Sequence, residues 1–81
     1  MAIPLFSRVA LTVDLPEYGL KAGDIATVVD SHESKGAKGY SLEIFNATGD
    51  TIAVIVVDES QINTLHNDEV LHIRHLEKLA A

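Results

Sequence analysis

The sequence has no cysteine and no tryptophan, and its only aromatic residues are two tyrosines and two phenylalanines among 81 positions. The lack of cysteine excludes disulfide bonds and thiolate zinc sites, and it fits a reducing compartment. So few rings count against a stacking platform for single-stranded nucleic acid. They also count against an aromatic-lined groove for proline-rich peptides.

Basic residues are also few, since six Lys and Arg stand against twelve Asp and Glu, for a formal net charge of −6. The six cations are scattered along the chain, whereas duplex nucleic acid repels an acidic surface unless cations cluster. The composition therefore disfavours nucleic-acid binding. Binding would require the Lys and Arg residues to cluster on one surface of the folded chain.

Long apolar runs are absent, and none approaches the length of a membrane span. The N-terminal stretch has no positively charged start, and Arg8 and Asp14 interrupt its apolar residues, which is not the pattern of a signal peptide. We therefore expect a soluble cytoplasmic protein with no membrane contact. Its size predicts a single domain over residues 1–81.

What the sequence does have is alternation of apolar and polar residues. Val9, Leu11 and Val13 share one face of residues 8–13, which is typical of a half-buried strand. Further strands are expected over residues 24–30, 40–45, 51–57 and 70–75. Five short strands with turn signals between them predict a closed or nearly closed barrel.

The connections carry their own signals. Pro16 ends the first strand, and an ordered loop over residues 15–23 follows. Residues 32–39 are polar and glycine-rich and are expected to form the most mobile loop. Three further segments complete the set: a tight hairpin turn at 46–50, a single helical or 3₁₀ turn at 58–62 with Asp58 as its N-cap, and a helix-compatible tail at 76–81.

Several short motifs resemble a family of small bacterial proteins known only as a domain of unknown function. They are Val9-Ala10-Leu11, Asp14-Leu15-Pro16, Gly19-Leu20, Gly23-Asp24, Thr27-Val28-Val29, Tyr40-Ser41-Leu42-Glu43 and Gly49-Asp50-Thr51. The resemblance covers roughly residues 5–75. It implies an SH3-type small barrel that is distantly similar to the barrel of the nitrile hydratase β subunit. It implies no active site, because the metal site of that enzyme belongs to its other subunit.

Pattern and resemblance together predict an all-β fold. We expect a five-stranded, mostly antiparallel SH3-like small barrel with one short helical turn near residues 58–62. The chain departs from similar barrels at Ala26, where they usually carry glycine. Because alanine is small, close packing at this position remains available.

The side chains that could bind a metal or take part in catalysis do not form a recognisable site. His72 and His75 have metal-ligand spacing for a helix, but on a strand they point to opposite faces. The pairs Asp58-Glu59 and Asp68-Glu69 stand at strand ends, where solvated carboxylates are common. No serine lies in a nucleophile-elbow context. We therefore expect no catalytic, cofactor-binding or metal-binding residue, and no enzyme.

The run from Ile52 to Val57 is apolar at all six positions. Strand side chains alternate between faces, and a small barrel has one interior, so one row of this strand has to face outward. We expect the outward apolar contacts to be Phe45, Ile52, Val54 and Val56. The alternative is that Ile3–Phe6 or Leu76–Leu79 folds over them.

These observations predict a non-enzymatic protein-interaction module that forms a homo-oligomer or serves as an accessory subunit. Two alternatives remain open. One is a nucleic-acid-binding small barrel, which the charge disfavours. The other is an acidic toxin-neutralising or regulatory partner that masks a basic surface.

Overall fold

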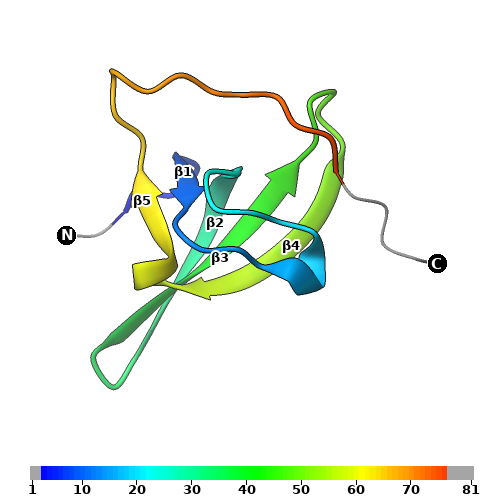
Figure 1. Ribbon diagram of the computed structural model, residues 1–81. Helices are drawn as coiled ribbons and strands as arrows, with labels where there is room; N and C mark the ends of the chain where they lie inside the picture. The colour runs from blue at the N-terminus through cyan, green and yellow to red at the C-terminus, as the bar shows by residue number, and fades with distance from the viewer. Residues whose placement is uncertain (1–2, 77–81) are drawn as a thin grey trace.

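Five antiparallel strands form one bent sheet in the computed structural model, which describes residues 3–76 (Figure 1). The strands are β1 (Arg8–Leu11), β2 (Ile25–Ser34), β3 (Ala37–Phe45), β4 (Thr51–Asp58) and β5 (Ile62–Thr64), in the order β4-β3-β2-β1-β5. Two 3₁₀ turns, η1 (Pro16–Tyr18) and η2 (Glu59–Gln61), complete the regular structure of the described residues. The all-β, five-stranded antiparallel prediction and the short turn near 58–62 are confirmed. The edge strands β4 and β5 do not pair with each other, so closure into a barrel is not confirmed.

The concave side of the sheet holds the core. Alternate residues of the strands point into it, as the period of two requires, and Leu20 joins them from the first loop. The buried set is Val9, Leu11, Leu20, Ala26, Val28, Tyr40, Leu42, Ile44, Ile55, Val57 and Ile62. Ala26 is 2% exposed, so its small side chain is enclosed by the core.

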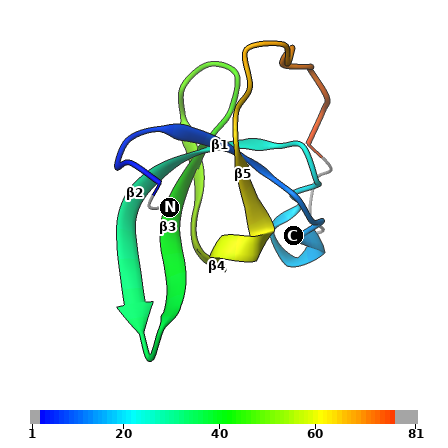
Figure 2. The same cartoon turned by 90° about the vertical axis from the view of Figure 1, so that its left-hand side faces the viewer.

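Beyond Asp30, β2 and β3 leave the core as a two-stranded arm that projects from the body in both views (Figures 1 and 2). The predicted loop over 32–39 is therefore wrong, because these residues pair across the arm down to Ser34 and Ala37. Lys35 and Gly36 form the turn with φ of 51° and 79°. Positive φ at both central residues is what a tight hairpin between right-twisted strands favours. The sequence pattern missed the arm because it has no core face and so no apolar alternation.

The predicted strand over 70–75 is also wrong, since the fifth strand is β5 at Ile62–Thr64. Asp58 caps η2, as predicted, by accepting a hydrogen bond from the Ser60 backbone N–H at 3.2 Å. Directly after that turn, Ile62 lies opposite Leu11 of β1. Residues 65–76 then cross one end of the sheet without a strand partner (Figure 1). Most of the tail predicted over 76–81 lies outside the described residues.

Candidate interaction surface

One row of β4 faces away from the core. The side chains of Val54 and Val56 are 64% and 70% exposed, whereas those of Ile55 and Val57 are 4% and 3% exposed. The pairing of β4 with β3 shifts between Ile44 and Phe45, so Ile52 is the extra residue of a β-bulge, and it is 39% exposed. The structure thus brings two of the predicted contact residues, Val54 and Val56, onto the outward face of β4.

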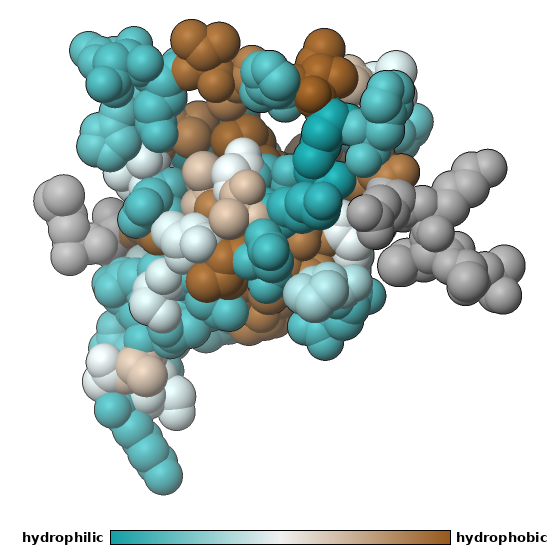
Figure 3. Space-filling model, viewed as in Figure 1, coloured by the Kyte–Doolittle hydropathy of each residue, from teal (hydrophilic) through white to brown (hydrophobic). Residues whose placement is uncertain are grey.

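The fourth predicted residue, Phe45, ends β3 and is 42% exposed. Phe45 and Ile52 both line a hollow of about 680 Å³ that runs beneath the segment containing Leu71 and Ile73. Hydrophobic side chains border this hollow in the space-filling view (Figure 3). The predicted residues therefore fall into two groups, with Phe45 and Ile52 at the hollow and two valines on the open face of β4.

The N-terminal and C-terminal segments, which were expected as alternatives to cover the outward row, do not cover Val54 and Val56 within the described residues. Ile3 packs against the core, and its backbone N–H donates to the Tyr40 hydroxyl at 3.3 Å. Leu5 and Phe6 are 49% and 73% exposed, and the Phe6 backbone N–H donates to the Val28 carbonyl of β2 at 2.6 Å, so this segment is held against β2. The C-terminal segment lies at the hollow instead. Among the described residues, nothing covers Val54 and Val56.

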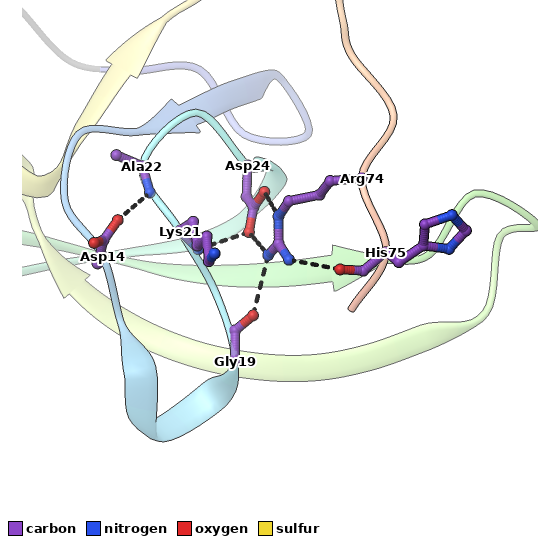
Figure 4. A network of polar contacts seen from close by, with 7 residues as sticks. All are labelled: Asp14, Gly19, Lys21, Ala22, Asp24, Arg74 and His75. Atoms are coloured by element: carbon purple, nitrogen blue, oxygen red, sulfur yellow. Dashed lines mark hydrogen bonds and ion pairs between the residues drawn. The ribbon is translucent and has the colours of Figure 1, made fainter. Parts of the chain in front are cut away.

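A polar contact that the sequence pattern did not indicate holds the C-terminal segment (Figure 4). The Arg74 guanidinium donates from Nε to Asp24 Oδ1 at 2.8 Å and from Nη2 to the Gly19 carbonyl at 3.0 Å, and it pairs with Asp24 Oδ2 as well. The same carboxylate accepts the Lys21 backbone N–H at 2.8 Å. This bidentate pairing ties residues 71–76 to the loop before β2.

The surroundings of Asp24 move its pKa in opposite directions. Partial burial raises the pKa of this carboxyl, but the Arg74 hydrogen bond, the Lys21 backbone N–H and the positive charges of both side chains together outweigh it. The pKa of Asp24 in the folded chain is therefore lower than its ordinary value. A carboxyl of this kind stabilises the fold above its ordinary pKa, and the stabilisation is lost as the pH falls through the folded pKa.

The lowered pKa of Asp24 leads to a prediction about the pH dependence of stability. Asp24→Asn is expected to lower the unfolding free energy by about 1 kcal/mol at pH 7, because the ion pair is partly exposed. The difference from the natural chain is expected to shrink as the pH falls below about 4. Urea unfolding between pH 7 and pH 2.5 measures it. Asp68→Asn, at an exposed carboxylate, is the matched control, and a constant difference at all pH values would contradict the assignment.

Three of the carboxylates that the sequence singled out, Asp58, Glu59 and Glu69, have local partners. The Tyr40 hydroxyl donates to Glu59 Oε2 at 3.0 Å, and Glu69 accepts the backbone N–H of His66. His32 Nε2 lies 2.7 Å from the Ser41 hydroxyl on the arm. Within residues 3–76, no three His, Cys, Asp or Glu side chains gather as a metal ion would require. No helix in that range has the length and hydrophobicity to cross a membrane.

Comparison with known proteins returns one family. No curated protein and no solved structure matches the chain. The matching family model is described as a domain of unknown function, and it spans residues 5–64, from the segment before β1 to the end of β5. Residues 65–76 lie beyond the match, and they include residues 71–76, which line the hollow. Because the model covers well over half of the 81 residues, this protein belongs to the family Domain of unknown function (DUF4926).

Proposed function

We propose that this protein is a non-enzymatic protein-interaction domain whose contact surface is the outward row of β4. It acts by self-association or as an accessory subunit. The observation that carries the proposal is the exposure of Val54 and Val56, at 64% and 70%, on a strand at the edge of the sheet. Apolar side chains gathered on one strand face mark a contact surface more readily than singly scattered ones.

The backbone of β4 adds to this argument. The strand pairs with β3 on one side, and no described strand lies on its other side. Thr51 to Val57 contains no charge, proline or glycine, which often protect an edge strand from pairing. The β-bulge at Ile52 interrupts the edge near its start, so the regular free edge runs from Ala53 to Val57. The surface therefore offers both apolar side chains and main-chain hydrogen-bonding groups to a partner.

The two alternatives draw less support from the structure. The ion pair with Asp24 engages Arg74, one of only six Lys and Arg residues, which weakens the case for nucleic acid. Masking of a basic protein would use acidic surface, and the outward row of β4 is neutral. The likeness to the nitrile hydratase β-subunit barrel and a bacterial origin stay predictions, and neither bears on the use of this surface.

The test is capture of partners from the native host with the tagged full chain. We expect the double variant Val54→Asp/Val56→Asp to lose at least about ten-fold of any specific partner, because burying a carboxylate at the contact is costly. Quantitative mass spectrometry of the captured proteins measures this, and rebinding with each purified partner confirms it. Val70→Asp is the control, since Val70 is 89% exposed and lies outside β4.

Circular dichroism melting of both variants shows whether they fold. Because both β4 positions are largely exposed, we expect melting curves close to that of the natural chain. Equal capture by the folded double variant and the natural chain would refute the proposed surface.

A further inference from the structure

The hollow beside Phe45 and Ile52 has the size and the construction of a small-molecule site. Its volume of about 680 Å³ falls within the roughly 300–1,000 Å³ of typical ligand pockets. The residues that line it come from the loop before β2, the start of β2, the turn between β3 and β4, and the segment over 71–76. Val54 and Val56 are not among them, so the hollow is separate from the outward row of β4.

Hydrocarbon side chains make up much of the wall of this hollow, as the space-filling view shows (Figure 3). They come from the buried core, from the two ends of the turn between β3 and β4, and from the segment after β5: Leu20, Ile44, Phe45, Ile52, Leu71 and Ile73. Apolar surface gains free energy when it leaves water. The wall therefore favours the hydrocarbon part of a ligand.

The charge of the lining differs in sign from that of the whole chain. Two of the six Lys and Arg residues, Arg8 and Arg74, line the hollow, against only one of the twelve Asp and Glu residues, Asp24. His72 and His75 line it too and add no negative charge. On a chain of net charge −6, the hollow is thus a place where positive charge gathers.

Of the two arginines, Arg74 is already engaged. Its guanidinium pairs with Asp24 and donates to the Gly19 carbonyl, and Figure 4 shows it turned toward that carboxylate. This contact holds the segment that carries Leu71 and Ile73 against the loop before β2. Arg74 therefore has a positioning role, since it keeps part of the apolar wall in place.

Arg8 is the available positive charge at the hollow. Its side chain makes no hydrogen bond or ion pair within residues 3–76. Its cross-strand neighbour on β2 is the uncharged Thr27, which also lines the hollow. Beyond Thr27 on β3 stands Glu43, whose carboxylate accepts a hydrogen bond from the Thr51 hydroxyl. No described carboxylate thus neutralises Arg8.

One class of ligand satisfies both the charge and the wall. A guanidinium pairs with a carboxylate through two parallel hydrogen bonds, and an apolar wall takes a hydrocarbon chain. A cation would meet a positive lining. An inorganic anion would leave the apolar wall in water.

The geometry points to the hollow as a binding site for a small amphipathic carboxylate, whose head pairs with Arg8 and whose hydrocarbon chain lies against the apolar wall. Residues 71–76 lie beyond the part of the chain that matches the family, so that part supplies only some of the wall. The site is separate from the proposed interaction surface on β4, and neither depends on the other.

Titration of the isotope-labelled full chain with decanoate at neutral pH, followed by amide chemical shifts, tests the site. Decanoate joins one carboxylate to one aliphatic chain. For a ligand of this size we expect a dissociation constant of roughly 0.1–1 mM. The shifts are expected to concentrate at Arg8, Ile52 and residues 44–48 and 71–76. Shifts spread over the whole surface, or none at these residues, would overturn the proposal.

Decylammonium is the matched ligand control, because it has the same chain length and the opposite charge. The net charge of −6 attracts a cation, so non-specific electrostatics predicts tighter binding of decylammonium. The site predicts the reverse order, with decanoate binding at least about five-fold more tightly at the hollow. Equal binding of the two ligands there would contradict a carboxylate site.

Arg8→Gln tests the contact with the carboxylate. We expect decanoate to bind about ten-fold more weakly, because a charge-assisted hydrogen bond is lost. Decylammonium is expected to bind as before or more tightly, since a repelling charge is gone. A variant that merely distorted the hollow would instead weaken both ligands.

Lys35→Gln is the matched control for that variant. It makes the same change in net charge at the exposed turn of the arm, away from the hollow. Decanoate binding is expected to stay within about two-fold of that of the natural chain, because exposed charges at a distance are screened. Equal weakening by Arg8→Gln and Lys35→Gln would mean that only the overall charge matters, and the assignment of Arg8 would fall.

Ile73→Asp tests the apolar wall. Ile73 and Val70 are both largely exposed positions of the segment after β5, but only Ile73 lines this hollow. We expect Ile73→Asp to weaken decanoate binding at least about five-fold and Val70→Asp less than about two-fold. Circular dichroism melting checks that both variants fold. Equal decanoate binding by the two folded variants would show that the chain of the ligand does not lie against this wall.

Discussion

Replacing Tyr40 with alanine is expected to lower the unfolding free energy by about 3–5 kcal/mol. That is a large share of the roughly 4–12 kcal/mol expected for a chain of this length. Tyr40 of β3 is 0% exposed and belongs to the buried core. Its hydroxyl donates to Glu59 and accepts the backbone N–H of Ile3, so one side chain connects the N-terminal segment, β3 and η2.

Urea unfolding followed by circular dichroism measures the effect, since the chain has no tryptophan to report it. Tyr40→Phe is the control that keeps the ring and removes the hydroxyl. We expect it to cost about 1–2 kcal/mol, because Glu59 and the Ile3 N–H each lose a partner in a partly buried place. A Tyr40→Ala chain as stable as the Tyr40→Phe chain would contradict the role of the ring in the core.

The second large effect is expected at Ile55. Ile55→Thr should cost about 2–4 kcal/mol, since the side chain is 4% exposed and the change removes apolar volume and buries a hydroxyl. Val56→Thr, at the next residue of the same strand, should change stability by less than about 0.5 kcal/mol because Val56 is 70% exposed. Both substitutions end in the same β-branched residue, so strand propensity is matched.

Unfolding midpoints of the two variants, measured at low protein concentration, decide which row of β4 faces the core. Similar losses for both would mean that the outward row is covered, and the proposed contact surface would lose its basis. A reversed order would mean that the strand presents its other face. The expected order supports Val54 and Val56 as surface residues without any assumption about a partner.

Local information was enough for much of the fold. Alternation over 40–45 and 51–57 predicted strands that the structure confirms, with β3 beginning three residues earlier. The turn before β4 was predicted from glycine, and Gly49 has a φ of 90°. Asp58 caps η2 as its position before a short turn indicated. Each of these depends on interactions between residues close in sequence.

Non-local pairing explains the failures. Residues 70–75 have a strand-like pattern, yet Val70 and Ile73 are 89% and 83% exposed because β5 already occupies the edge beside β1. The contact between Arg74 and Asp24 joins residues that are 50 positions apart, and neither residue type signals the other. The periodicity of a short stretch of sequence carries no information about a contact between residues so far apart.

The sequence by itself determined that this is an acidic, cysteine-free all-β chain with one strand apolar on both faces. Alternation requires two rows on that strand, and a small core can take only one of them. Only the tertiary structure decided that Val54 and Val56 form the outer row and that their strand lies at the sheet edge. The reason is physical: periodicity is a property of one strand, whereas exposure and edge position depend on how all five strands pair.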